Sequence, residues 1–132
     1  MKIIKSTDNS LIKKFRSLSV KKYREQFGLY LLEGEKVVLE ALKVKDAVVN
    51  LIIKESAISN FSGLIERLND LIILVSDEVY NSLCFAVTPQ DIMAVVKTNT
   101  NKALNINTNL IVLDRLQDPG NLGTIIRSSV AS

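Results

Sequence analysis

The chain has 132 residues, of which 47% are hydrophobic and 23% are charged, and its formal net charge is +3. This composition is too apolar for intrinsic disorder, and the apolar runs are too short to span a membrane, so we expect a soluble globular domain. Because the chain has no histidine and a single cysteine, Cys84, it cannot form a Ser-His-Asp or Cys-His catalytic site, a histidine-ligated metal site or an internal disulfide.

Two basic helices are predicted near the N-terminus. Apolar residues recur at helical spacing from Leu11 to Leu18, which predicts an amphipathic helix with a basic outer side, and a shorter helix is expected over residues 20–26, capped by Gly28. Residues 1–24 hold eight lysines or arginines against one acidic residue, a net charge of +7. Such a segment favours a polyanion such as RNA or DNA, although it is also consistent with a solvated helix face.

The middle of the chain alternates apolar runs with helical patterns. Strands are predicted over residues 29–32, 48–53, 71–75 and 92–96. Helices are predicted after Gly34, over residues 58–68, and from Ser76 as N-cap towards residue 86. This alternation predicts an α/β fold, a three-layer α/β/α sandwich with helices on both faces of the sheet, spanning residues 1–97.

The composition changes after residue 97. Residues 98–109 are rich in asparagine, which is typical of a linker. A buried strand is then expected over residues 110–113 and a helix over 121–131. Because one strand and one helix cannot bury a core, we expect residues 110–132 to be the truncated start of a second domain. The apolar side of that helix would then pack on the first domain, pair with another chain or stay disordered.

The connection into this last helix is the most informative stretch. Pro119 and Gly120 shape a tight turn, and Asn121 is expected to cap the helix. Gly123 permits close approach of a backbone or an anion, and Arg127 follows one turn later on nearly the same side, where it can grip a phosphate. The alternative is an ordinary strand-to-helix connection. A dinucleotide-binding unit is disfavoured because the glycines do not complete Gly-x-Gly-x-x-Gly.

The whole run resembles the first signature motif of the SpoU/TrmH family of RNA ribose 2′-O-methyltransferases. The matching residues are Gln117-Asp118-Pro119-Gly120-Asn121-Leu122-Gly123-Thr124-Ile125-Ile126-Arg127. Four earlier stretches are similar, in order, to the substrate-binding domain of that family: Ser10 to Lys14, Leu18 to Arg24, Leu32-Glu33-Gly34 and Val87-Thr88-Pro89-Gln90. Asp91 departs from the pattern, since glycine commonly follows the Thr-Pro-Gln run.

The resemblance implies both a fold and an activity. Family members join an N-terminal domain similar to kink-turn-binding ribosomal proteins to a trefoil-knot domain that binds S-adenosylmethionine and forms homodimers. The implied reaction methylates a ribose 2′-hydroxyl of rRNA or tRNA. The resemblance implies that Arg127 activates or orients this hydroxyl, together with RNA phosphate, and that Asn121 supports it. Asp118, Pro119, Gly120 and Gly123 form the turn of the motif.

The later motifs of the family have no counterpart before Ser132. We therefore expect these 132 residues to bind RNA but neither to bind S-adenosylmethionine nor to transfer methyl groups. The alternative is a stand-alone RNA-binding adaptor of the kink-turn-protein type. The residues expected to contact RNA are Lys13, Lys14, Arg16, Lys21, Lys22 and Arg24, with Gly34 as a further candidate.

Other side chains are also candidates for a functional role. Tyr23, Phe27 and Tyr30 lie among the basic residues, where they can stack on bases or, as is more common, pack in the core. Cys84 is interpreted as a buried apolar residue. No metal or membrane partner is expected, and the absence of a signal peptide makes the cytoplasm the expected location.

Overall fold

The computed structural model describes residues 2–85, 90–98, 107 and 109–131. The chain divides into two compact units, Met1–Thr100 and Asn101–Ser132. The motif residues Val87, Thr88 and Pro89, and most of the predicted linker over residues 98–109, lie outside the described residues. Within the described part of the chain, no helix combines the length and the hydrophobicity needed to cross a bilayer.

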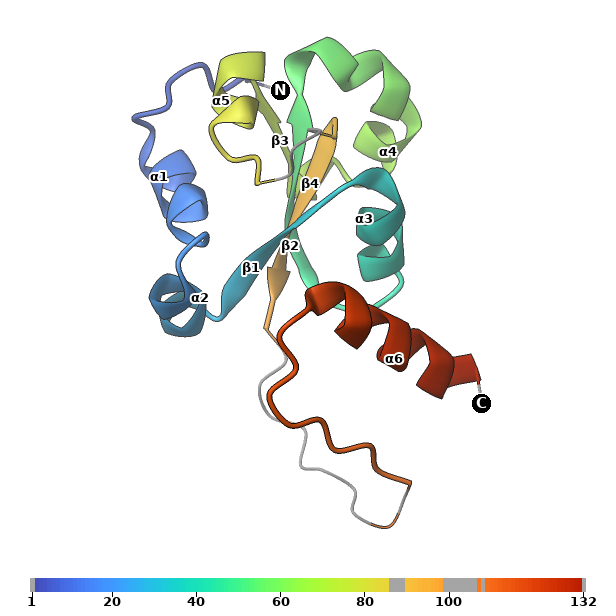
Figure 1. Ribbon diagram of the computed structural model, residues 1–132. Coiled ribbons are helices and arrows are strands. Elements are labelled where there is room, and N and C mark those ends of the chain that lie inside the picture. The colour runs from blue at the N-terminus through green and yellow to red at the C-terminus, as the bar shows by residue number, and fades with distance from the viewer. Residues whose placement is uncertain (1, 86–89, 99–106, 108, 132) are drawn as a thin grey trace. The chain divides into compact units, whose positions relative to one another are not determined.

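The first unit alternates helices and strands as predicted. In chain order its elements are α1 (Ser10–Ser17), α2 (Lys21–Phe27), β1 (Leu29–Glu33), α3 (Glu35–Leu42), β2 (Val48–Lys54), the 3-10 helix η1 (Glu55–Phe61), α4 (Ser62–Arg67), the 3-10 helix η2 (Asn69–Leu71), β3 (Ile72–Val75), α5 (Asp77–Asn81) and β4 (Ile92–Lys97) (Figure 1). All four predicted strands are present, and each begins and ends within one residue of its predicted bounds.

The strands form one mixed sheet in the order β1-β4-β2-β3. β4 is antiparallel to both of its neighbours, whereas β2 and β3 are parallel. All residues of β4 from Ile92 to Val96 are buried, which explains why this strand reads as a continuous apolar run rather than as an alternating pattern. The predicted α/β class is confirmed.

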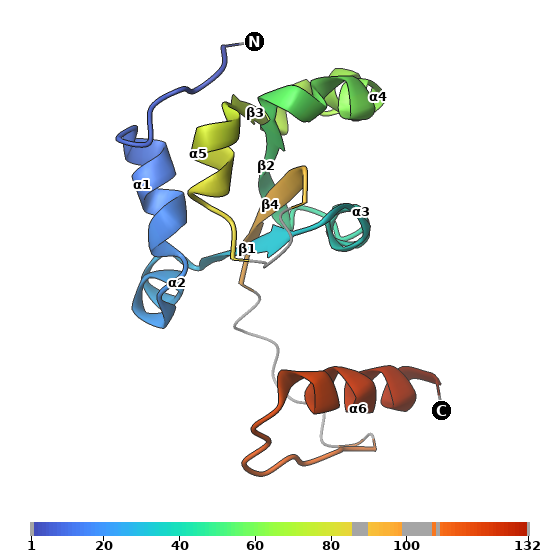
Figure 2. The same cartoon turned by 45° about the horizontal axis from the view of Figure 1, so that its top comes forward.

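Helices α1 and α5 cover one face of the sheet (Figures 1 and 2). Ile12, Phe15 and Leu18 are buried because a spacing of three residues keeps them on one side of α1. They form a core cluster with residues of the sheet and of the α5 region: Ile52, Val75, Val79, Tyr80, Leu83, Met93 and Val95.

Helix α3 and the η1–α4 segment cover the opposite face (Figure 2). Val38 of α3 is buried against the sheet, while Val37 and Leu39 on either side of it are 45% and 44% exposed. The helix therefore contributes only a narrow apolar stripe to the second core cluster, whose sheet members are Leu51, Ile53, Ile72, Leu74, Ile92, Ala94 and Val96.

Two helix predictions in this unit are wrong in extent. The helix expected over residues 58–68 is divided into η1 and α4, because Ile58 and Phe61, three residues apart, align on a 3-10 helix and both pack against the second cluster. Helix α5 ends at Asn81 instead of continuing towards residue 86. Its last turn is closed by the Ser82 hydroxyl, which donates to the Val79 carbonyl at 2.7 Å and offers the backbone an alternative to a further helical turn.

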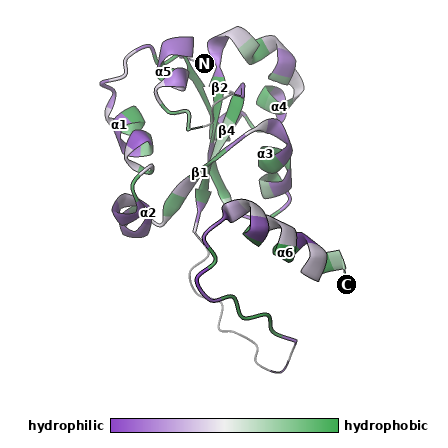
Figure 3. Cartoon of the chain, in the orientation of Figure 1, coloured by the Kyte–Doolittle hydropathy of each residue, from purple (hydrophilic) through white to green (hydrophobic). Residues whose placement is uncertain are grey.

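The second unit contains, in its described residues, the helix α6 (Pro119–Ala131). The strand predicted over residues 110–113 is wrong: these residues form no strand and are exposed, because no described strand of this unit pairs with them. Figure 3 shows this segment to be hydrophobic all the same. None of the described side chains of α6 is buried.

Helix α6 begins two residues earlier than predicted, at Pro119, which suits the first helical position because proline lacks an N–H. Asp118 is its cap, since the Oδ1 atom accepts from the Gly120 N–H at 2.8 Å and the carbonyl from the Leu122 N–H at 3.2 Å. The prediction that Asn121 caps the helix is therefore wrong, and Asn121 lies in the first turn.

Candidate functional site

The lysines that the sequence predicts to contact RNA lie on the outer sides of two short consecutive helices. Asn9 starts α1 by accepting the Leu11 N–H at 2.9 Å, and Gly28 ends α2 in the left-handed conformation, at a φ of 61°. Because the apolar stripe of α1 is buried in the core, its lysines face solvent. We name the exposed lysines and aromatic rings of these helices the α1–α2 surface, formed by Lys13, Lys14, Lys21, Lys22, Tyr23 and Phe27.

The ion pairs on this surface are exposed. Lys13 lies 2.9 Å from Asp8 and lowers the pKa of that carboxyl by hydrogen bonding and by its charge. Lys21 lies 3.6 Å from Glu25, one turn along α2, and its side chain is 79% exposed. Exposed pairs of this kind contribute little to stability, so these lysines can exchange a carboxylate for a phosphate.

The two arginines that the sequence predicts to contact RNA donate hydrogen bonds within the domain instead of facing solvent freely. The Arg16 Nη2 atom donates to the Ser82 hydroxyl at 2.9 Å and thereby links α1 to the end of α5. Arg24 Nη1 donates to the carbonyls of Leu18 and Ser19 at 3.0 and 2.7 Å, which satisfies carbonyls left open at the end of α1. The sequence could not separate these arginines from the lysines around them.

Two of the three aromatic candidates are at the surface. Tyr23 and Phe27 are each 37% exposed, and their rings stack with centroids 6.3 Å apart. The Lys14 and Lys22 ammonium groups lie over these rings, 4.9 Å from the Phe27 centroid and 5.8 Å from the Tyr23 centroid. The core-packing interpretation is therefore wrong for this pair, whereas Tyr30 is half-buried and packs against the second cluster.

A turn at the end of β1 joins two of the family motifs. Gly34 is buried at a φ of 113°, which side chains rarely adopt, and its carbonyl starts α3 by accepting the Val38 N–H. The Glu33 carboxylate accepts the Phe85 N–H at 3.2 Å and the Gln90 N–H at 3.1 Å, on either side of residues 86–89. The sequence placed Glu33 at a strand-to-helix turn, within the matched Leu-Glu-Gly stretch, but did not predict its hydrogen bonds to Phe85 and Gln90.

Asp91, which departs from the family pattern, forms an ion pair. The Asp91 carboxylate lies 2.7 Å from the Lys54 ammonium, and this hydrogen bond raises the pKa of Lys54. Nearby, Cys84 is half-buried rather than buried, and desolvation raises the pKa of its thiol to about 12. The thiol therefore stays protonated at neutral pH, in agreement with a packing role.

The motif helix presents its polar residues to solvent. Asn121 and Arg127 are both exposed, and a spacing of six residues places them about 120° apart around the helix axis and about 9 Å apart along it. The fold of α6 alone therefore does not bring these two side chains together. A Cβ atom at Gly120 would lie 3.2 Å from Asp118 Oδ1, so a side chain there would crowd the cap, whereas Gly123 has open space around it.

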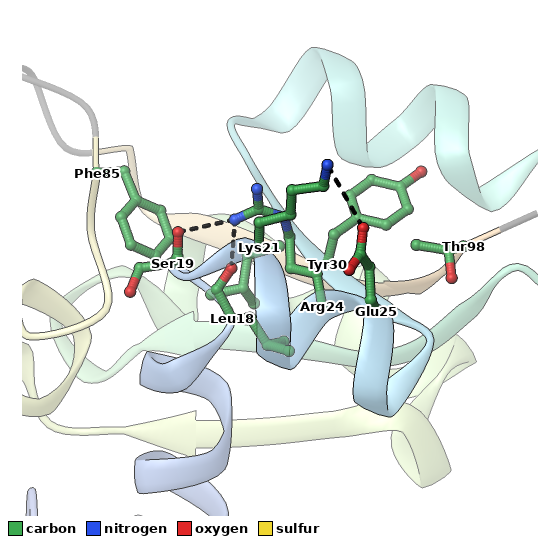
Figure 4. Close-up of a pocket in the computed structure, with 9 residues that line it drawn as sticks. Leu18, Ser19, Lys21, Arg24, Glu25, Tyr30, Phe85 and Thr98 are labelled. Atoms are coloured by element: carbon green, nitrogen blue, oxygen red, sulfur yellow. Dashed lines mark hydrogen bonds and ion pairs between the residues drawn. The ribbon is translucent and has the colours of Figure 1, made fainter.

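The first unit also contains a pocket of about 690 Å³ beside the α1–α2 surface. Figure 4 shows the Phe85 and Tyr30 rings on opposite sides of the Lys21 and Arg24 side chains. No prediction from the sequence placed Phe85 at a site.

Comparisons with known proteins identify this domain. Residues 9–94 match the model of the MRM3-like substrate binding domain family. Over 132 residues, all of this chain and 52% of the relative, the chain is 33% identical to the 23S rRNA (guanosine(2553)-2′-O)-methyltransferase RlmP of Bacillus subtilis (strain 168). It therefore spans about half the length of that protein.

Solved structures show the same likeness. The AdoMet-bound rRNA methyltransferase from Sinorhizobium meliloti matches with a TM-score of 0.72 and 26% identity, over 98% of this chain and 51% of that one. The SpoU methyltransferase AviRb from Streptomyces viridochromogenes shares the fold, with a TM-score of 0.70 at 22% identity, over 93% of this chain and 48% of that one. The chain belongs to the MRM3-like substrate-binding domain family, whose relatives are SpoU/TrmH RNA 2′-O-methyltransferases, as its motifs predicted.

Proposed function

We propose that the first unit binds structured RNA and is the substrate-binding part of an RNA ribose 2′-O-methyltransferase that acts on rRNA or tRNA. The observation that supports it most is the α1–α2 surface, which has four exposed lysines, two of them, Lys14 and Lys22, over a stacked aromatic pair. Lysines supply salt-dependent attraction to phosphates, and exposed rings can stack on unpaired bases. The relatives, which are named as rRNA methyltransferases, support the same assignment.

Arg127 and Asn121 are proposed to act at the ribose and its phosphate. A guanidinium is a poor base at its ordinary pKa, so Arg127 is better suited to hold a phosphate in bidentate fashion and to orient the hydroxyl than to remove its proton. Because α6 alone separates the two side chains, Asn121 would support the site from a different side of the helix.

S-adenosylmethionine is proposed as the methyl donor of the longer protein, in keeping with the AdoMet-bound relative. The described residues of the second unit do not fit this group by themselves, because α6 has no buried side chain and the segment before it is exposed. Since the chain spans about half of its relatives, we propose that donor binding, methyl transfer, the trefoil knot and homodimer formation require residues outside these 132. Titration calorimetry with S-adenosylmethionine, with no heat of binding expected, tests this for the chain alone.

The likeness to kink-turn-binding proteins and a cytoplasmic location remain part of the proposal. The first is supported by helices on both faces of the sheet, in separate core clusters. The second is supported by the single cysteine, Cys84, because a chain with one cysteine forms no internal disulfide and so suits a reducing compartment.

Fluorescence anisotropy tests the RNA-binding proposal. The 132-residue chain is titrated against a structured rRNA hairpin and a DNA duplex of matched length at several salt concentrations. We expect tighter binding to the RNA, with an affinity that falls steeply as salt rises. Equally weak binding to both nucleic acids would contradict the proposal.

A matched pair of double variants locates the interface. K14A/K22A removes two lysines from the α1–α2 surface and should lower the slope of log affinity against log salt by about 1.5. K36A/K43A removes two exposed lysines from α3 and its end, and should leave that slope unchanged. Equal effects of the two double variants would show that the interface is elsewhere.

A further inference from the structure

The pocket beside the α1–α2 surface combines apolar walls with two cationic side chains, those of Lys21 and Arg24. Its walls come from the turn between α1 and α2, from α2 itself, from β1, and from residues that follow α5 and β4. The described residues that line it are Leu18, Ser19, Lys21, Arg24, Glu25, Tyr30, Leu31, Phe85 and Thr98 (Figure 4). Its volume of about 690 Å³ falls within the range of sites that hold small molecules.

One of the two cations of the pocket, Arg24, is held in place before any ligand arrives. Both hydrogen bonds of the Arg24 guanidinium to the end of α1 are made by Nη1, which orients the planar group without neutralising it. Lys21 carries the second positive charge, and its exposed partner Glu25 is 3.6 Å away. Arg24 can therefore contact a phosphate with little reorganisation, while Lys21 can exchange its exposed carboxylate partner for the same phosphate.

The aromatic side is anchored as well. The Phe85 side chain is 54% exposed, although its backbone N–H is held by the Glu33 carboxylate at 3.2 Å. An exposed ring on a fixed backbone is a suitable platform for a flat, partly apolar ligand. Tyr30 supplies a second ring, at the opposite side of the two cations (Figure 4).

We propose that this pocket receives one unpaired nucleotide of the RNA. Its base stacks on Phe85, and its phosphate contacts Lys21 and Arg24. The charge of the pocket matches a nucleotide and not a cationic or purely apolar ligand. The inference rests on the proposed RNA binding and adds to it a requirement for an unpaired base.

Three RNA hairpins test this with the 132-residue chain. One carries a single bulged adenosine, the second an abasic nucleotide at the same place, and the third is fully paired. Anisotropy titrations should show the bulged hairpin bound about tenfold more tightly than the paired one, with the abasic hairpin in between.

Variants then separate the contribution of the Phe85 ring from that of the Lys21 charge. F85A should remove most of the preference for the base over the abasic site, while F85Y, which keeps a ring, should retain it.

K21A should weaken the binding of the bulged and abasic hairpins by the same factor. K43A is its matched control, since Lys43 is also an exposed lysine of a helix-end pair, with Glu40, and should change neither affinity. Thermal unfolding midpoints of all variants check the fold, and K21A cannot act through it because the side chain is exposed.

The outcomes separate the two proposals. If the chain prefers RNA over DNA but binds the bulged and paired hairpins equally, or if F85A keeps the preference for the base, the pocket proposal is overturned and RNA binding stands. If no hairpin is bound more tightly than duplex DNA, RNA binding itself fails, and the pocket proposal fails with it.

Discussion

Side chains of the same charge have different roles in the N-terminal helices. Arg16 and Arg24 donate to groups inside the domain, whereas Lys13 and Lys14 stay exposed, beside Asp8 and over the Phe27 ring respectively. A guanidinium offers several directed donors that match backbone carbonyls, while an ammonium on a flexible stem stays more easily in water. The sequence did not distinguish these arginines from the lysines, because all of them occupy polar positions of predicted helices. Only the residues that surround each side chain in the fold separate them.

Tyr80 allows a prediction at the level of one hydroxyl group. The residue is fully buried, its hydroxyl has no hydrogen-bond partner among the described residues, and desolvation raises its pKa. Tyr80→Phe should therefore change the free energy of unfolding by less than about 1 kcal/mol, or increase it, because no bond is lost. Tyr80→Ala should decrease it by roughly 3–5 kcal/mol by opening a cavity. Urea unfolding measures both, and a loss of more than about 2 kcal/mol for Tyr80→Phe would mean that the hydroxyl is bonded.

At the scale of elements, the turn between β1 and α3 links segments that are far apart in the sequence. Glu33 and Gly34 join β1 to α3 and, through the Glu33 carboxylate, hold the backbone on both sides of residues 86–89. The sequence placed this turn correctly. It did not show the link to Phe85 and Gln90, because residues more than fifty positions apart meet only after β1 and β4 have paired.

The two glycines at the starts of α3 and α4 make a matched test of backbone strain. Gly34 has a φ of 113°, so Gly34→Ala should lower the free energy of unfolding by about 1–3 kcal/mol. Gly63 lies in α4 with open space around its Cα, and Gly63→Ala should raise that free energy by up to about 1 kcal/mol through helix propensity. Urea titration measures the free energy of unfolding of both variants. Equal changes for Gly34→Ala and Gly63→Ala would contradict the argument from φ.

For the whole molecule, the main contrast is between a unit with two core clusters and one with no described buried side chain. The first unit buries apolar residues on both faces of its sheet. In the second, Ile126 and Val130 of α6 are 55% and 85% exposed. An isolated helix of this length is only marginally stable in water, so its stability depends on tertiary contacts.

Hydrogen exchange measured by mass spectrometry checks this contrast. Amides of β4 should exchange most slowly, because they open only with the whole domain, whereas those of α6 should exchange orders of magnitude faster. The measurement is made at two protein concentrations. If α6 is as protected as β4, its apolar side is covered in solution, and protection that increases with concentration would identify a second copy of the chain as the cover.

The sequence by itself determined the α/β class, the four strands, the basic N-terminal helices and the family, because these depend on local patterns and on contiguous motifs. Only the tertiary structure decided which cations face solvent, how Glu33 holds Phe85, and where Phe85, Tyr30, Lys21 and Arg24 form a pocket. It also showed that residues 110–113 form no strand. A strand needs a second strand for its backbone hydrogen bonds, and an apolar sequence pattern does not supply one. Local order follows from neighbouring residues, whereas a site depends on contacts between segments that the sheet brings together.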